Sequence, residues 1–257
     1  MSLRNAVQVI FDIETVRGKN FIGNEQSGVP MKTIEDCEDA FEKAWFKHGE
    51  RKYKDMNVED SFEKGAGLVP EFGMIVCIVA MDSISKIPVR FKMIIEDGEP
   101  DFDAIEKGML LNFYMWLDEL EEESKNPVQL IGHYIKKFDV PYVNTRSAKH
   151  GLKIHSAFKC YGIKPWDLIM IDTKEVWNGG IFGTSQASSL DNVCRILGIE
   201  SPKNGGEDEL DGSMVGEEFW NGKGKMSERV KRICDYCERD VIANAKVLNK
   251  MFSLNMI

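Results

Sequence analysis

The chain has 257 residues, 43% of them hydrophobic, and 42 acidic against 33 basic side chains give it a net charge of −9. This length and composition suit one compact domain with a sizeable core and exclude global disorder. The acidic balance excludes a general nucleic-acid coat, although divalent cations would reverse the field of an acidic active site. No run of 18 apolar residues and no signal-peptide pattern occur, so we expect a cytoplasmic protein without a membrane span.

Apolar periodicity predicts strands and helices that alternate along the chain. In the first part we expect a strand over Val7–Ile13, a loop over 17–33, a helix over Ile34–Tyr53, a loop over 54–73, and strands over Met74–Met81 and Val89–Ile95. The remainder predicts a helix over Asp101–Glu123, a strand over Val128–Ile131, a helix over Phe138–His150, a strand over Leu168–Ile171, a helix over Ala187–Leu197, loop or two short turns over 200–224, and a helix over Ser227–Phe252 with Ser227 as N-cap. This order predicts an α/β chain with a mixed central sheet flanked by helices. We expect a single domain over 1–257 with an insertion at about 17–73.

Six cysteines are spread along the chain, and two of them form Cys234-x-x-Cys237. This spacing invites a zinc or redox interpretation, but it falls inside a helical pattern without a second cysteine pair or a nearby histidine. Free buried thiols in a reducing compartment are the better explanation.

Two carboxylates end the first predicted strand. Asp12 and Glu14 are two residues apart, so both side chains point to the same face of a strand. The plainer alternative is a strand that emerges into solvent, and taken alone the two interpretations are evenly matched.

Two further acidic positions come later. Asp139 follows a short strand at the start of a predicted helix, where a negative charge is favourable for that reason alone. Tyr236 and Asp240 are four residues apart and share one face of the last helix. A surface tyrosine beside an acid is common, so neither segment identifies a site by itself.

Together and in this order, the three segments resemble the DEDD exonucleases, and Tyr236 marks the tyrosine branch because Asp235 stands where the other branch has histidine. The resemblance extends to a family related to the exonuclease domain of family-B DNA polymerases, through Gly132-His133, Phe138-Asp139-x-Pro141, Ser189-Leu190-Asp191, Leu197-Gly198-Ile199, Asp211-Gly212-Ser213 and Tyr236-Cys237-x-x-Asp240-Val241. It covers nearly the whole chain, with 17–73 the least matched part.

The resemblance implies an RNase H-like exonuclease fold and a two-metal-ion 3′-5′ exonuclease that releases nucleoside 5′-monophosphates from single-stranded DNA. It implies that two divalent cations, Mg²⁺ or Mn²⁺, are held by Asp12, Glu14, Asp139 and Asp240, and that Tyr236 orients the attacking water. Carboxylates suit such oxygen-seeking ions, and two ions can activate the nucleophile and stabilise the leaving oxygen. An exoribonuclease of the same chemistry and a catalytically weak nucleic-acid-binding module remain open, as does the oligomeric state.

Candidate contacts to the nucleic acid are Thr15, Tyr134, Lys136, Lys137 and Phe138. Tyr134 is a departure, because relatives usually have Asn at this place, and a tyrosine could stack on a base. We expect Phe11 and Phe138 to lie in the core and not to stack on bases. Further basic residues could grip the strand, although we expect at least half of them on a solvated helix face: Arg146, Lys149, His150, Lys153, Lys223, Lys225, Arg229, Lys231 and Arg232.

Overall fold

The computed structural model describes residues 6–19, 35, 37, 40–53, 56–96, 98–164, 167–180, 188–203 and 210–257. The chain divides into two compact units, one made of Met1–Glu14 with Ile75–Ile257 and the other of Thr15–Met74. The second unit spans nearly the same residues as the insertion expected at 17–73. The single exonuclease domain interrupted by this insertion stays a prediction.

A mixed five-stranded sheet forms the centre of the first unit, in the order β3-β2-β1-β4-β5. Its strands are β1 (Val7–Arg17), β2 (Gly73–Asp82), β3 (Pro88–Lys92), β4 (Val128–Gly132) and β5 (Met170–Asp172). β4 pairs in parallel with β1 and β5, whereas β2 and β3 are antiparallel. Val9 lies opposite Leu130, and Leu130 lies opposite Met170. The mixed sheet is therefore confirmed, with β1 longer and β3 shorter than the apolar pattern predicts.

Helices connect and cover the strands of this unit. They are α3 (Phe102–Ser124), α4 (Asp139–Lys149), α5 (Thr173–Trp177), α6 (Leu190–Leu197), α7 (Val215–Asn221) and α8 (Met226–Ser253), with a short 3₁₀ turn at Ser156–Phe158. α5 was not predicted, and α7 is a helix where loop or two turns were expected. Ser227 is not the N-cap, because α8 already begins at Met226 and Glu228 accepts the backbone N–H of Lys225 at 3.0 Å.

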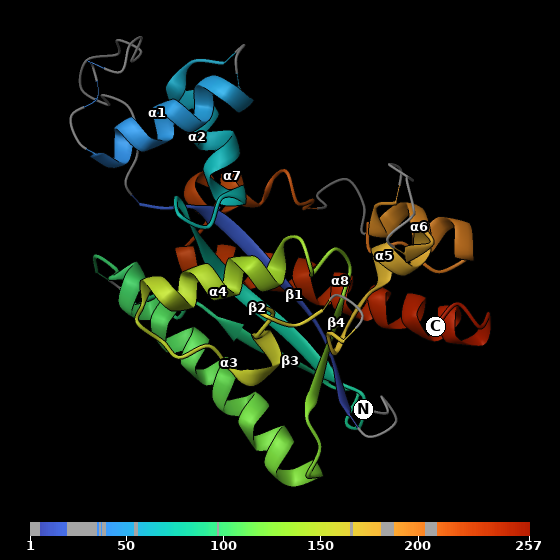
Figure 1. The fold of residues 1–257 in the computed structure, drawn as a ribbon. Helices are drawn as coiled ribbons and strands as arrows, with labels where there is room; N and C mark the ends of the chain where they lie inside the picture. The colour runs from blue at the N-terminus through green and yellow to red at the C-terminus, as the bar shows by residue number, and fades with distance from the viewer. Residues whose placement is uncertain are drawn as a thin grey trace. The chain divides into compact units, whose positions relative to one another are not determined.

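The long helices α3 and α8 cover opposite faces of the sheet (Figure 1). On β3, Arg90 donates to Asp235 and Glu238 of α8, whereas the ring of the next residue, Phe91, lies 5.2 Å from that of Phe113 on α3. Successive side chains of a strand point to opposite faces, so the two helices must lie on different sides.

The same alternation orients β1. The ring of Phe11 lies 6.1 Å from that of Phe113, inside the main hydrophobic core. Asp12 therefore faces α8, and Phe11 belongs to the core as expected.

The second unit is helical, partly within the helix expected over Ile34–Tyr53 and partly where a loop was expected. It contains α1 (Ala40–Lys52), α2 (Val58–Gly65) and the 3₁₀ turn η3 (Ala66–Leu68). The loop expected over 54–73 is wrong because Asn57 accepts the backbone N–H of Asp60 at 2.7 Å and caps a helix that buries Phe62. Residues 34, 36 and 38–39 of the helix predicted over Ile34–Tyr53, and residues 20–33 of the preceding loop, lie outside the described residues.

Across the described part of the chain, no helix combines the length and the apolar character needed to cross a membrane.

Candidate active site

The middle of β1 supplies two carboxylates on the face that α8 covers, since the strand continues beyond them to Arg17. Asp12 and Glu14 alternate with the core residues Phe11 and Ile13. Ligand atoms of Asp12, Glu14 and Cys237 all lie within 4.8 Å of one another. The strand geometry expected from the Asp-x-Glu spacing is therefore present, and Glu14 is buried rather than emerging into solvent.

Asp139 is the first residue of α4, directly after the loop that follows β4. Its Oδ1 accepts the backbone N–H of Ile13 at 3.2 Å, and its side chain is buried. This hydrogen bond joins the start of α4 to β1 between the two carboxylates of the strand.

α8 carries the remaining two predicted residues. Tyr236 and Asp240 lie one helical turn apart, so their side chains share one face of α8. The charge of Asp240 raises the pKa of both Asp12 and Glu14. The charge of Glu14 in turn raises the pKa of Tyr236. The structure thus brings together all five predicted residues from β1, α4 and α8: Asp12, Glu14, Asp139, Tyr236 and Asp240.

Burial and mutual repulsion dominate the electrostatics of this cluster. Burial raises the pKa of Asp12 well above its usual value, and the charges of Asp139, Glu14 and Asp240 raise it further. Burial likewise raises the pKa of Glu14, followed by the charges of Asp240 and Asp139. Clustered carboxylates that disfavour one another's charge are relieved by a bound cation.

The other ionisable groups of the cluster respond in the same way. Burial raises the pKa of Asp139 to about 7 although its backbone hydrogen bonds oppose the shift. Burial raises the pKa of Asp240 to about 6, against the Tyr236 hydroxyl and the charges of Lys203 and Arg239. The pKa of Tyr236 is raised by burial and by the neighbouring carboxylates, so its hydroxyl stays protonated near neutral pH and is a poor base.

The donor set fits hard divalent cations. Four carboxylates offer the oxygen ligands that Mg²⁺ and Mn²⁺ prefer. A second acidic group of the described residues, Asp103, Glu106 and His150, contrasts with it. There the Glu106 carboxylate already accepts hydrogen bonds from Arg146 at 2.6 Å and from His150 at 2.8 Å. Its charge is therefore satisfied within the protein, whereas repulsion persists among the acids at β1.

Asp172, at the end of β5, is a buried carboxylate that the sequence did not single out. Its Oδ1 accepts the backbone N–H groups of Tyr134 at 2.9 Å and Lys174 at 3.0 Å, and its Oδ2 accepts that of Lys136 at 3.2 Å. Asp172 thereby caps α5 and fixes the loop that leads to Asp139. The only signal in the sequence is an acid that follows a short apolar strand.

Tyr134 adopts a backbone conformation that few residues favour. Its φ is +74°, in the left-handed region, which Asn and Gly tolerate better than an aromatic residue. The residue is 44% exposed, and Lys174 Nζ lies 4.1 Å from the centroid of its ring. The Asn of relatives therefore suits the backbone at this position, independently of any contact with substrate.

The other candidate contacts to nucleic acid differ in their exposure and in their contacts within the protein. Lys136 pairs with Glu175 at 2.8 Å, whereas Lys137 is exposed. Phe138 packs against the core, with its ring 5.4 Å from that of Tyr142. The Thr15 hydroxyl donates to the Gly67 carbonyl at 2.7 Å within the second unit. Nucleic-acid binding by these residues stays a prediction.

Several of the more distant basic residues are engaged within the protein. Arg146 is buried against Glu106, Lys149 pairs with Asp103, Lys231 pairs with Asp235, and Arg232 pairs with Glu218. Lys149, Lys231 and Arg232 are exposed, as expected for residues on a solvated helix face, whereas Arg146 is buried, so this expectation is wrong for Arg146.

No disulfide joins the six cysteines, all of which lie in the described part of the chain. The thiol of Cys77 on β2 interacts with those of Cys234 and Cys237 on α8, and burial raises its pKa well above the usual value. Cys237 Sγ also lies 3.5 Å from Asp12 Oδ2. The Cys-x-x-Cys pair is therefore part of the packing between the sheet and α8, with Cys237 next to Asp12.

Comparison with known proteins gives one family. A family model described as a predicted 3′-5′ exonuclease related to the exonuclease domain of PolB matches residues 71–253. This range includes Asp139, Tyr236 and Asp240 and begins after Asp12 and Glu14. An uncharacterized protein of Methanocaldococcus jannaschii is 31% identical over 140 residues, which are 54% of this chain and 70% of that protein.

Among solved structures, the family B DNA polymerase of the hyperthermophilic archaeon Pyrobaculum calidifontis is similar, with a TM-score of 0.53 and 15% sequence identity. The similarity covers 98% of this chain and 25% of the polymerase, so the chain spans a quarter of that protein. At this identity the likeness concerns the fold alone, and it confirms the expected RNase H-like α/β fold.

Proposed function

The chain belongs to the family of predicted 3′-5′ exonucleases related to the exonuclease domain of PolB, and we propose that it is a two-metal-ion 3′-5′ exonuclease. Its substrate is single-stranded DNA, from which it releases nucleoside 5′-monophosphates. Asp12, Glu14, Asp139 and Asp240 hold two Mg²⁺ or Mn²⁺ ions.

One observation carries this proposal. Carboxylates from β1, α4 and α8, separated by more than a hundred residues of sequence, lie close enough to raise the pKa of Asp12 through their charges. A protein gains no stability from such repulsion. The arrangement is explained when a cation is the missing partner.

The bound ions would supply charge neutralisation for the phosphodiester and activation of water. The chain supplies the frame that holds their ligands: the Ile13 N–H orients Asp139, and α8 carries Tyr236 and Asp240 on one face. Tyr236 keeps its proton, so it positions the attacking water and does not remove a proton from it.

Cleavage of 5′-labelled single-stranded DNA tests the proposal. We expect shortening with Mg²⁺ or Mn²⁺, none in EDTA, and less than about a tenth of the wild-type rate for Asp12→Ala and for Asp240→Ala, because each removes a metal ligand. Glu122→Ala, which removes an exposed acid of α3, is the matched control and should cleave normally. A matched RNA oligomer tests the exoribonuclease alternative. Retention of normal activity by either active-site variant would refute the assignment.

A further inference from the structure

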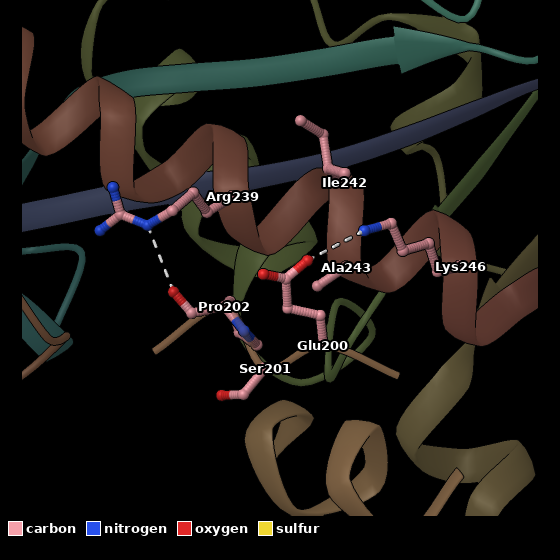
Figure 2. Close-up of a pocket in the computed structure, with 7 residues that line it drawn as sticks. All are labelled: Glu200, Ser201, Pro202, Arg239, Ile242, Ala243 and Lys246. Atoms are coloured by element: carbon pink, nitrogen blue, oxygen red, sulfur yellow. Dashed lines mark hydrogen bonds and ion pairs between the residues drawn. The ribbon is translucent and has the colours of Figure 1, made fainter. Parts of the chain in front are cut away.

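A cavity of about 220 Å³ lies along α8, on the side where residues 200–202 pack against the helix. Figure 2 shows the seven residues that line it: Glu200, Ser201, Pro202, Arg239, Ile242, Ala243 and Lys246. The floor is apolar, and charged groups stand around it. Part of the wall is fixed, because Ser201 donates to Asp191 on α6 and Arg239 Nε donates to the Pro202 carbonyl at 3.2 Å.

The two cations of the cavity are held differently. Arg239 is fixed by Pro202, and its guanidinium carbon lies 5.7 Å from the centroid of the Tyr236 ring. Lys246 lies 3.9 Å from Glu200, and both of these side chains are largely exposed. An exposed pair at this distance stabilises the protein little. An incoming anion can therefore take Lys246 from Glu200 at low cost.

The cavity adjoins the candidate active site through α8. Arg239, which lines the cavity, directly precedes Asp240 on α8. Lys246 is six residues beyond Asp240, or about 9 Å along the helix axis. At about 100° per residue, Arg239 and Lys246 lie on one flank of α8, and Asp240 lies about a third of a turn around the helix from Lys246. A strand whose 3′ end lies at the carboxylates reaches the cavity with its next nucleotides if it continues around this flank.

We propose that this cavity binds a phosphodiester of the substrate strand on the 5′ side of the bond that is cut. The inference rests on the proposed function and names a binding site for that same substrate. Arg239 and Lys246 bind the phosphate, while Ile242, Ala243 and Pro202 contact the attached sugar. A local positive site also explains how a chain of net charge −9 holds a polyanion.

Charge variants at the cavity test the proposal against a matched control. Lys246→Glu reverses the charge at position 246, and Glu200→Gln removes the negative charge that pairs with Lys246. Lys250→Glu makes the same charge change one turn further along α8, at an exposed residue outside the cavity. Long-range repulsion between the added negative charge and the DNA strand affects Lys246→Glu and Lys250→Glu alike. A larger effect of Lys246→Glu on strand binding therefore comes from the cavity.

The measurements are the KM and kcat for a 10-nucleotide single strand, and the affinity of that strand for Asp12→Ala protein carrying each variant. We expect Lys246→Glu to raise KM about tenfold, to weaken binding equally, and to lower the salt slope of the binding constant by about 0.7, the loss of one phosphate contact. kcat should change little. Glu200→Gln should strengthen binding, a gain that misfolding cannot produce, and Lys250→Glu should stay within about twofold of the parent protein.

Substrate length distinguishes the strand from other ligands. A dinucleotide contains only the phosphodiester that is cut, so Lys246→Glu should not affect its cleavage. Equal effects of Lys246→Glu and Lys250→Glu on the 10-nucleotide strand would overturn the proposal. The proposal would also be overturned if Lys246→Glu lost inhibition by free dAMP without a change in the KM for the strand. The cavity would then be a site for the released nucleotide. If wild-type protein cuts no strand, the proposed function fails, and the binding measurements alone still decide the role of the cavity.

Discussion

At the scale of single residues, Tyr134 combines an unfavourable backbone with a favourable ring contact. A φ of +74° in a non-glycine residue costs roughly 1–2 kcal/mol. The contact of Lys174 with the exposed ring returns only about 0.5–1 kcal/mol. The backbone cost is the larger of the two, so Asn or Gly would adopt this backbone conformation at a lower cost than tyrosine does.

We therefore predict that Tyr134→Asn keeps or raises activity on DNA and leaves the free energy of unfolding within about 1 kcal/mol of the wild type. Tyr134→Val should be clearly less stable, because a β-branched residue tolerates the left-handed region poorly. Urea denaturation and the cleavage rate measure both effects. Complete loss of activity in Tyr134→Asn would show that the ring itself contacts the substrate.

Asp139 provides a test by pH. Its folded pKa of about 7 lies above the reference value of 3.8. A carboxyl with a raised folded pKa contributes stability below its unfolded pKa and loses that contribution as pH rises through the folded value. In EDTA, the wild type should therefore lose stability relative to Asp139→Asn between about pH 4 and 7, by at most about 1.4 kcal/mol per pH unit.

The measurement is urea unfolding of both proteins across this range. Saturating Mg²⁺ should remove or reverse the trend, because the ions bind the ionised carboxylates. A constant difference between the two proteins in EDTA would contradict the burial of an uncompensated Asp139.

At the scale of elements, long periodic segments and short apolar strands were predictable, whereas the short helices α2 and α5 were not. α3 and α8 repeat the helical period many times, and β2 is a continuous apolar run, so each was found from the sequence within a few residues. α5 has only five residues, and it depends on the Asp172 side chain as its cap. α2 depends on Asn57 in a stretch rich in glycine. Such helices are specified by caps and tertiary contacts more than by a periodic pattern.

Asp172 links two elements and should be costly to remove. Asp172→Ala leaves the N–H groups of Tyr134, Lys136 and Lys174 without their acceptor, at an expected cost of about 1–3 kcal/mol. Activity should also fall, because the loop leading to Asp139 loses its support. Asp172→Asn keeps one acceptor oxygen and should lose less of both. Thermal unfolding and cleavage rates check this, and an Ala variant as stable and active as the wild type would contradict it.

At the scale of the whole molecule, the site was more predictable than its surroundings. The Asp-x-Glu spacing places two carboxylates on one face of β1, and the Tyr-x-x-x-Asp spacing places two side chains on one face of α8. These spacings alone did not identify a site, and the five side chains were proposed together only through the resemblance of all three segments to a known exonuclease family. Asp172 could not be assigned, since its partners are backbone N–H groups brought together only by the fold. The cavity beside α8 was equally hidden, because Arg239 and Lys246 look like ordinary residues of a solvated helix until residues 200–202 pack against them.

The central claim is that this chain removes nucleotides from a 3′ end, and a comparison of linear with closed circular DNA tests it most directly. Both single strands are incubated with the wild-type protein and Mg²⁺ or Mn²⁺, with the linear strand labelled at its 5′ end. We predict a descending ladder from the linear strand and an intact circle, because a buried carboxylate cluster can receive a terminus but not the interior of a continuous strand. Cutting of the circle as fast as the linear strand would contradict the exonuclease assignment and identify an endonuclease on the same fold.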